Sequence, residues 1–267
     1  MVNVRYAVAA SSGDVDRSVS RWQPGARGVI TDRDLAMIEW IARFPCVTID
    51  LLRRWLVELA EGGRAESIIY TRLRFLQRAG LVESDRILAS ASRAVWCTLE
   101  GLRAGGQNTR QVRAIPPRVG TFEHDLMVAW LALEIAITKP NFQLVTEREM
   151  RSFETVNQHH QDRPDPVQFT TPAETGQRRV YPDLVTVLPS GAHVVHEIER
   201  TPKETRRLER LMLAHLSNPA VSSARYYARR GVVLNRLEEA AKNARETATA
   251  RGIEKALTVV EYDGEVT

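Results

Sequence analysis

The strongest constraint on the fold of this chain is a short apolar hairpin with acidic residues at its open end. Two apolar runs, Leu184 to Leu188 and Ala192 to Val195, flank the turn residues Pro189, Ser190 and Gly191. Apolar runs of this length on either side of a proline and glycine turn are typical of two antiparallel strands. The sequence therefore predicts a β-hairpin over this segment.

The turn also determines which side chains face each other. If the three turn residues form a type I turn that ends in a left-handed glycine, Leu188 pairs with Ala192. Asp183 then lies directly opposite Glu197. Opposed side chains share one face about 5 Å apart, where two negative charges destabilise the pair unless a proton or a cation intervenes. A shift of one residue would remove this pairing.

This clustering of carboxylates suggests a site for a divalent cation. Asp183 and Glu197 are the predicted Mg²⁺ ligands, Glu199 is a third ligand or a catalytic base, and Glu134 on the preceding predicted helix completes the ligand set. An alternative requires no metal, because the acids at the end of the strand then form solvated ion pairs. The basic partners in that alternative are Arg200, Lys203, Arg206 and Arg207.

The N-terminal part has the pattern of three helices followed by short strands. Thr31 and Asp34 resemble a capping box, Thr48 caps a second helix, and a third helix is predicted from Glu66 to Ala79. The third helix has a polar stripe opposite its apolar face, and a hairpin that carries Arg93 near its tip follows. Helix, helix, helix and hairpin is the order of a winged helix-turn-helix. The stripe consists of Ser67, Thr71, Arg74 and Arg78.

Hydroxyl and guanidinium groups are suited to reading a DNA groove, because arginine binds guanine through two hydrogen bonds and serine or threonine reaches phosphates and base edges. The stripe and Arg93 therefore predict contacts with double-stranded DNA. The alternative is an ordinary solvated helix face. The net charge of +4 is compatible with nucleic acid but does not require it.

The predicted C-terminal order is a helix, three strands, a helix and a strand, followed by a further helix and strand, which implies a layered α/β domain. The predicted organisation is a flexible arm over residues 1–27, a DNA-binding domain over 28–105, a basic linker over 106–120 and the α/β domain over 121–267. Arg151 to Arg179 has no apolar period and is predicted to be a long loop.

The composition bears on the cellular location of the protein and on the state of its cysteines. No stretch approaches eighteen consecutive apolar residues, so no membrane span and a cytoplasmic protein are expected. Cys46 and Cys97 have no nearby partner cysteine, which favours buried thiols over a disulfide or a zinc site.

The C-terminal order of elements, with Pro182-Asp183 on one strand and Glu197 and Glu199 on the next, resembles the PD-(D/E)xK restriction-endonuclease-like fold. That resemblance implies that Asp183 and Glu197 bind magnesium, with Glu199 where a lysine is expected. The whole chain is similar to the replication-relaxation family of plasmid and mobile-element proteins, which join a winged helix to such a domain. The matching stretches are Leu76–Val82, Thr98–Gly106, His124–Leu126, Pro182–Asp183 and Glu197–Thr201.

Two functions follow as expectations. In the first, the protein binds DNA in plasmid replication or mobilisation, and its second domain nicks or cleaves DNA with Mg²⁺. In the second, it is a non-catalytic winged-helix regulator whose degenerate nuclease-like domain serves homodimerisation or partner binding. Glu199 in place of lysine favours the second function, and the retained carboxylates favour the first.

Overall fold

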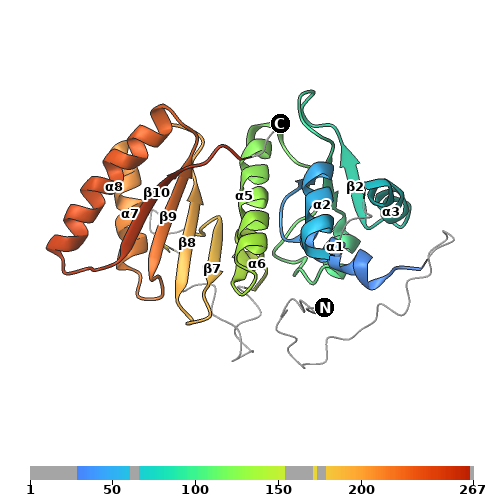
Figure 1. Ribbon diagram of the computed structural model, residues 1–267, viewed down its shortest axis with the longest axis horizontal. Coiled ribbons are helices and arrows are strands. Elements are labelled where there is room, and N and C mark those ends of the chain that lie inside the picture. Colours follow the sequence, from blue (N-terminus) through green and yellow to red (C-terminus); the bar gives the residue numbers. More distant parts are fainter. Residues whose placement is uncertain (1–28, 61–65, 154–170, 173–178, 265–267) are drawn as a thin grey trace.

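A computed structural model describes residues 29–60, 66–153, 171–172 and 179–264 (Figure 1). The predicted arm over residues 1–27 and most of the predicted loop between residues 151 and 179 lie outside this part of the chain. Cys46 and Cys97 are both free and buried, as predicted. Within the described ranges, no helix combines the length and the apolar character needed to cross a membrane.

The N-terminal unit combines helices with a small antiparallel sheet in the order β1-β3-β2. The predicted helix starts are confirmed, because Thr31 and Asp34 cap each other's backbone N–H and the Thr48 hydroxyl accepts from the N–H of Leu51 at 3.2 Å. The elements are α1 (Asp32–Ala42), β1 (Val47–Thr48), α2 (Ile49–Trp55) with a π-helical extension (Leu56–Ala60), α3 (Glu66–Arg78), β2 (Val82–Asp85), β3 (Ala94–Cys97) and α4 (Leu99–Ala104).

The C-terminal unit contains a mixed sheet of five strands in the order β10-β9-β8-β7-β4. Strands β4, β7 and β8 pair antiparallel, and β8, β9 and β10 pair parallel. The elements are α5 (Val119–Thr138), β4 (Gln143–Thr146), α6 (Glu147–Phe153), β5 (Thr171–Pro172), β6 (Arg179–Val180), β7 (Leu184–Val187), β8 (His193–Ile198), α7 (Thr205–Ser217), β9 (Ser223–Ala228), α8 (Val232–Ala250) and β10 (Ala256–Glu261).

The hairpin between β7 and β8 has the predicted register. Leu184 pairs with His196, and beyond the ladder the N–H of Leu188 donates to the carbonyl of Ala192 at 2.8 Å. Gly191 has φ 80°, the left-handed conformation that the predicted turn requires. Continuing the same register by one residue places Asp183 opposite Glu197.

Helices cover both faces of the five-stranded sheet, so the unit has three layers (Figure 1). Alternate residues of one strand belong to different cores, as the pleat of a strand requires. Val185 and Val195 pack in the core beneath α7 and α8, whereas Leu184 and Ile198 pack in the core that contains α5. A mixed α and β architecture with a layered sheet is therefore confirmed.

Helix α5 belongs to both units. Its buried residues share one continuous core with α1, α2 and β3 on one side and with Leu184 and Ile198 of the sheet on the other. Polar groups reinforce the junction, because Arg43 donates to the carbonyl of Leu144 at 2.7 Å and Arg148 donates to the carbonyl of Phe44 at 2.6 Å. In the segment predicted as a linker, Val112 is buried in the same core.

Some element boundaries differ from those predicted. The strand predicted to run from Arg225 to Leu234 ends at Ala228, because Gly231 at φ 125° turns the chain into α8. Helix α8 therefore begins at Val232 rather than near Leu237, and Leu234 is buried as part of the helix. Helix α6 was not predicted, and its last residues fall at the start of the predicted loop.

Candidate functional site

The three acids of the hairpin lie together where β8 ends and the chain turns toward α7. Asp183 precedes β7, Glu197 lies in β8 and Glu199 follows β8, so all three occupy alternate positions that share one face of the sheet. Glu197 is 7% exposed and Glu199 is 4% exposed. Carboxylates this deeply buried require partners, because an uncompensated buried charge is strongly unfavourable.

Asp183 is held in place from two sides. Its Oδ2 accepts a hydrogen bond of 2.8 Å from the N–H of Ile198, and its Oδ1 lies 3.1 Å from Nε2 of His124 on α5. Burial lowers the pKa of His124, but the hydrogen bond to Asp183 and the charge of Asp183 outweigh burial, so that the pKa is raised above its ordinary value of 6.5. A protonated His124 therefore neutralises much of the charge on Asp183.

Glu197 is the most strongly perturbed acid of the cluster. Burial raises its pKa well above the ordinary value of 4.5, and the neighbouring charges of Asp183 and Glu199 raise it further. Its Oε1 atom is buried and has no hydrogen-bond partner among the described residues. Nε2 of His215 on α7 lies 3.6 Å from this atom. Glu197 therefore carries an acceptor that nothing in the described chain satisfies.

His215 is placed by Tyr226 of β9. Its Nδ1 lies 2.8 Å from the Tyr226 hydroxyl, and burial lowers the pKa of His215 to about 4, so that the ring is neutral near pH 7. The Glu197 register partner on β9 is also Tyr226. Sequence reasoning missed His215 and Tyr226, because neither lies in a motif; a histidine on the buried stripe of an amphipathic helix was the one available signal.

Glu199 has a basic partner. The Nζ atom of Lys203 lies 2.6 Å from Oε1 of Glu199. Burial raises the pKa of Glu199, and Lys203 opposes that rise. The predicted ion-pair alternative thus describes Glu199 correctly in part, although Arg200 pairs with Glu123 of α5 instead.

The structure does not bring Glu134 to this cluster, in contrast to the prediction. Glu134 follows His124 on α5 by ten residues, which corresponds to about 15 Å along a helix. It also lies on the α5 side of the sheet, where its charge contributes to the raised pKa of Tyr227. The side chain was predicted to complete the ligand set because a sequence does not show which part of a long helix lies beside the strand end.

In one respect, the carboxylates of Asp183, Glu197 and Glu199 fit a small hard cation. The orphaned Oε1 of Glu197 and the mutual repulsion of three acids are both relieved by a positive charge at the cluster. Among the described residues, no group of three or more His, Cys, Asp or Glu side chains converges closely enough to hold a metal ion by itself. Magnesium, however, is commonly held by only one or two carboxylates together with water and substrate phosphates. Asp183 and Glu197 are the residues that would hold it.

The predicted DNA-binding stripe is exposed where its side chains are described. Thr71, Arg74 and Arg78 all lie on the exposed face of α3, while Leu73 and Leu76 are buried on the opposite face. The side chain of Ser67 lies outside the described part of the chain.

Arg72, between the stripe and the core, pairs with the buried Asp34 of α1 through Nε at 2.8 Å. This ion pair anchors α3 to α1 and was not predicted, because Asp34 was assigned only to the helix cap.

Arg93 is exposed, but the prediction that it lies near the tip of the hairpin is wrong. It immediately precedes β3, and its carbonyl accepts from the N–H of Ile49 at the start of α2 at 3.1 Å. The loop between the paired residues Asp85 and Ala94 is long, and Arg93 lies at its base. The strand was predicted to begin near the right position, but the length of the loop was underestimated.

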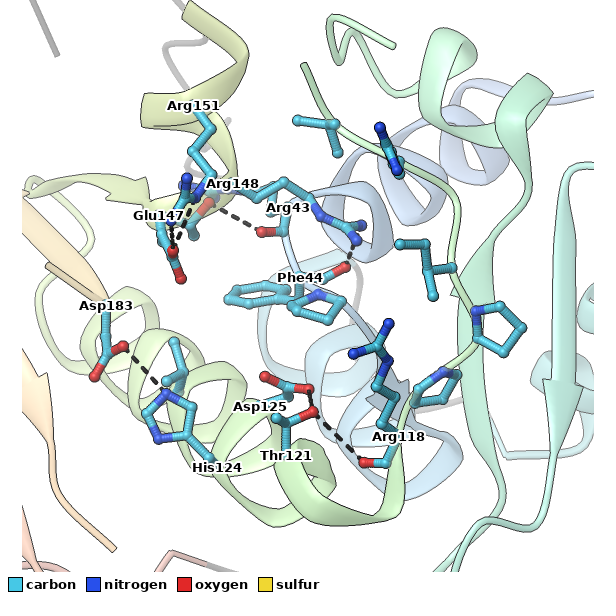
Figure 2. A pocket seen from close by; sticks show the side chains of 18 of the residues that line it. Arg43, Phe44, Arg118, Thr121, His124, Asp125, Glu147, Arg148, Arg151 and Asp183 are labelled. Atoms are coloured by element: carbon cyan, nitrogen blue, oxygen red, sulfur yellow. Dashed lines mark hydrogen bonds and ion pairs between the residues drawn. The ribbon is translucent and has the colours of Figure 1, made fainter. Parts of the chain in front are cut away.

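A cavity of about 430 Å³ lies between the two units, beside the acidic cluster (Figure 2). It is lined by the segment from Gln111 to Arg118, the first turns of α5, the start of α6 and the end of α1. Asp183 and His124 also line it, so one member of the acidic cluster faces the cavity. Burial raises the pKa of Asp125, another lining residue, to about 6, although His124 opposes the rise.

Comparisons with protein-family models, with curated proteins and with solved structures find no match to this chain. The arrangement of its own residues therefore carries the functional argument. That arrangement consists of an exposed basic helix face, a mixed-charge cavity and a buried acidic cluster, joined through α5.

Proposed function

We propose that the protein binds double-stranded DNA through its N-terminal unit and acts on the DNA backbone at the acidic cluster of its C-terminal unit. The observation that carries the proposal is the exposed Thr71, Arg74 and Arg78 face of α3. The order α1, β1, α2, α3, β2, β3 and the sheet order β1-β3-β2 support a winged helix-turn-helix, in which the third helix enters the major groove.

The C-terminal elements support a nuclease-like domain. A helix, three antiparallel strands, a helix and a parallel strand occur in this order as α5, β4, β7, β8, α7 and β9, with α6, β5 and β6 inserted between β4 and β7, and this is the order on which the PD-(D/E)xK resemblance depends. Asp183 immediately precedes β7 and Glu197 lies in the adjacent strand β8, the placement on consecutive strands that the resemblance describes. Membership in the replication-relaxation family is part of the same proposal.

Each residue of the cluster has a distinct part in the proposed chemistry. A bound magnesium ion would stabilise charge on the phosphoryl oxygens and lower the pKa of a water molecule. His124 and the N–H of Ile198 fix the Asp183 carboxylate in one orientation. Lys203, held by Glu199, supplies a positive charge beside the acids and stands in for the lysine that Glu199 replaces.

A second candidate is a DNA-binding regulator without catalysis. The observation that favours it is that two of the three acids already have a basic partner within the chain. His124 pairs with Asp183, and Lys203 pairs with Glu199. In this reading the α/β unit serves homodimerisation or the binding of a partner. Both candidates share the DNA contact by α3.

DNA binding is tested with a fluorescent duplex and the double variant Arg74→Ala/Arg78→Ala. Loss of two phosphate or base contacts should weaken binding and reduce the slope of log K against log salt by about two. The matched control is Lys242→Ala/Arg251→Ala, which removes two exposed charges at the far side of α8. Equal salt slopes for the parent and both double variants would contradict the proposed binding face.

Cleavage is tested with supercoiled plasmid in magnesium or manganese. The parent should convert the plasmid to nicked or linear forms, and Asp183→Asn and Glu197→Gln should not. Glu246→Gln, an exposed acid on α8, is the control that should retain activity. If no form of the plasmid is cut while all variants bind DNA normally, the regulator is the correct function.

A further inference from the structure

The cavity beside the acidic cluster has two chemically different sides. Its floor includes Phe44, Val112 and Val128, which are nearly or fully buried, and its accessible apolar surface is formed by Ile115 and Pro116. Its outer rim carries Arg113 and Arg118, which are exposed and have no side-chain hydrogen bond or ion pair with any described residue. Arg118 and Asp183 lie on opposite sides of the opening (Figure 2).

The other three arginines of the lining already have partners, and Arg151 pairs with Glu147 on its own helix at 2.6 Å. Arg43 donates to the carbonyl of Leu144 and pairs with Glu149 at 3.0 Å, and Arg148 donates to the carbonyl of Phe44. Their role is therefore to join the units. Arg113 and Arg118 are the lining cations whose charge is available to an incoming anion.

The volume of the cavity suits one planar ring system with its sugar rather than a double helix. A volume of about 430 Å³ lies at the lower end of the range for small-ligand sites. Ile115 and Pro116 offer accessible apolar surface for a base, and the rim offers guanidinium groups for a phosphate. Asp125, whose hydroxyl partner is Thr121 at 3.1 Å, adds a polar group that can bond to the edge of a base.

We propose that this cavity receives one unpaired nucleotide of a DNA strand, with the base against Ile115 and Pro116 and a phosphate against Arg113 and Arg118. The inference rests on the proposed DNA binding and defines its substrate class. The preferred DNA contains an unpaired base, because a base must leave the helical stack before it can enter such a site. Asp183, at the opposite side of the opening, then faces the backbone of the same strand.

The test compares two duplexes that differ only by one unpaired thymine, with binding measured in EDTA so that no cleavage occurs. The parent should bind the duplex with the unpaired thymine about ten-fold more tightly, since burial of one base against apolar side chains contributes on that order. The thymine should also become protected from permanganate, which oxidises the exposed double bond of an unstacked thymine.

Two substitutions at Thr121 separate a filled cavity from a lost hydrogen bond. Thr121→Phe fills the space from the first turn of α5, whereas Thr121→Ala loses the same bond to Asp125 and keeps the space. Thr121→Phe should abolish both the preference and the protection, and Thr121→Ala should retain both. Arg113→Ala/Arg118→Ala should reduce the preference and leave affinity for the fully paired duplex less affected.

The outcomes distinguish this inference from the proposed function. Equal affinity of the parent for both duplexes, a thymine that stays reactive in the complex, or Thr121→Phe that behaves like Thr121→Ala would each overturn the nucleotide site. Thymidine monophosphate that binds as tightly as the DNA would assign the cavity to a free nucleotide and overturn the strand assignment. Loss of paired-duplex binding in Arg74→Ala/Arg78→Ala tests α3 alone.

Discussion

Oε1 of Glu197 and Nε2 of His215 lie 3.6 Å apart in the buried layer between β8 and α7, and neither atom has a hydrogen-bond partner among the described residues. The other face of the sheet offers a contrast. There His196 is satisfied at both ring nitrogens, by the Tyr227 hydroxyl at 2.8 Å and the Thr186 hydroxyl at 3.0 Å. Two similar histidine and tyrosine pairs thus flank β8, and the incomplete one faces the acids.

Glu197→Gln should be at least as stable as the parent when metal is removed. The pKa of Glu197 is raised by burial and by Asp183 and Glu199, so its protonated form stabilises the folded state below the ordinary pKa of 4.5. That stabilisation is lost as the pH rises through the pKa of the folded state. Glutamine has no charge to lose, and a gain of about 1 kcal/mol would raise the melting temperature by about 2–4 °C.

The measurement is thermal unfolding in EDTA at acidic and at neutral pH. The advantage of the variant should be larger at neutral pH and should disappear at pH values below 4.5. Glu246→Gln, which removes an exposed acid, should melt like the parent throughout. A clear loss of stability for Glu197→Gln at neutral pH would contradict the crowding of the acids.

Asp183→Asn should lower the pKa of His124. In the parent, the hydrogen bond to Asp183 and the charge of Asp183 outweigh burial and hold the pKa above 6.5. Without the carboxylate, burial becomes the dominant influence and disfavours the charged ring. The measurement is an NMR titration of the histidine ring signals. His215, whose pKa is lowered by burial to about 4, serves as an internal reference that stays neutral near pH 7. An unchanged His124 titration in the variant would refute the pairing.

Asp34→Asn should destabilise the N-terminal unit by about 1.5–3 kcal/mol, the range for a hydrogen bond to a charged group. Asp34 is 1% exposed and accepts from Arg72 and from the backbone of Thr31. Burial raises the pKa of Asp34, but the hydrogen bonds from Arg72 and Thr31 outweigh it and lower the pKa below 3.8.

The pH dependence of this effect has a defined sign. The contribution of Asp34 is present above the unfolded pKa of about 3.8 and is lost as the pH falls through the lower pKa of the folded state. Urea unfolding should therefore show a difference between parent and variant at pH 7 that shrinks in strong acid. Asp50→Asn, which removes a half-exposed acid paired with Arg53 at 3.3 Å, should change stability by less than about 1 kcal/mol.

Gly191→Ala should destabilise the protein by about 1 kcal/mol, because Gly191 has φ 80° and a side chain disfavours that conformation. A β-carbon there would meet no atom within 4 Å, so the cost is conformational and not steric. Gly120→Ala is the matched control, since it also meets nothing within 4 Å but lies in the first turn of α5. Urea unfolding should show the control equal to or more stable than the parent.

The sequence was sufficient to predict features that depend on local rules. The turn at Gly191 fixed the register of Asp183 and Glu197, and the caps at Thr31 and Thr48 fixed two helix starts. In each case the residues that determine the feature lie within a few positions of it in the sequence. The order of the main helices and strands along the chain followed from the same local patterns, although α6 was missed.

Features that depend on tertiary contacts were not predictable in this way. His124, Lys203 and His215 reach the acids from α5, from the turn before α7 and from α7. Which turn of a helix lies beside a strand end depends on packing, and for that reason the sequence pointed to Glu134 and not to His124 as the α5 residue beside the acids. The sharing of one core by α5 and both units is likewise a property of the assembled fold.

Because α5 is part of both units, the exposed face of α3 and the acidic cluster are connected by a packed core and not by a flexible linker. The fold therefore fixes the distance between α3 and the acidic cluster. Under the proposed function, a duplex bound by α3 would be altered at a constant distance from the bases in contact with α3, and lengthening α5 by one turn should change that distance without changing the bound sequence.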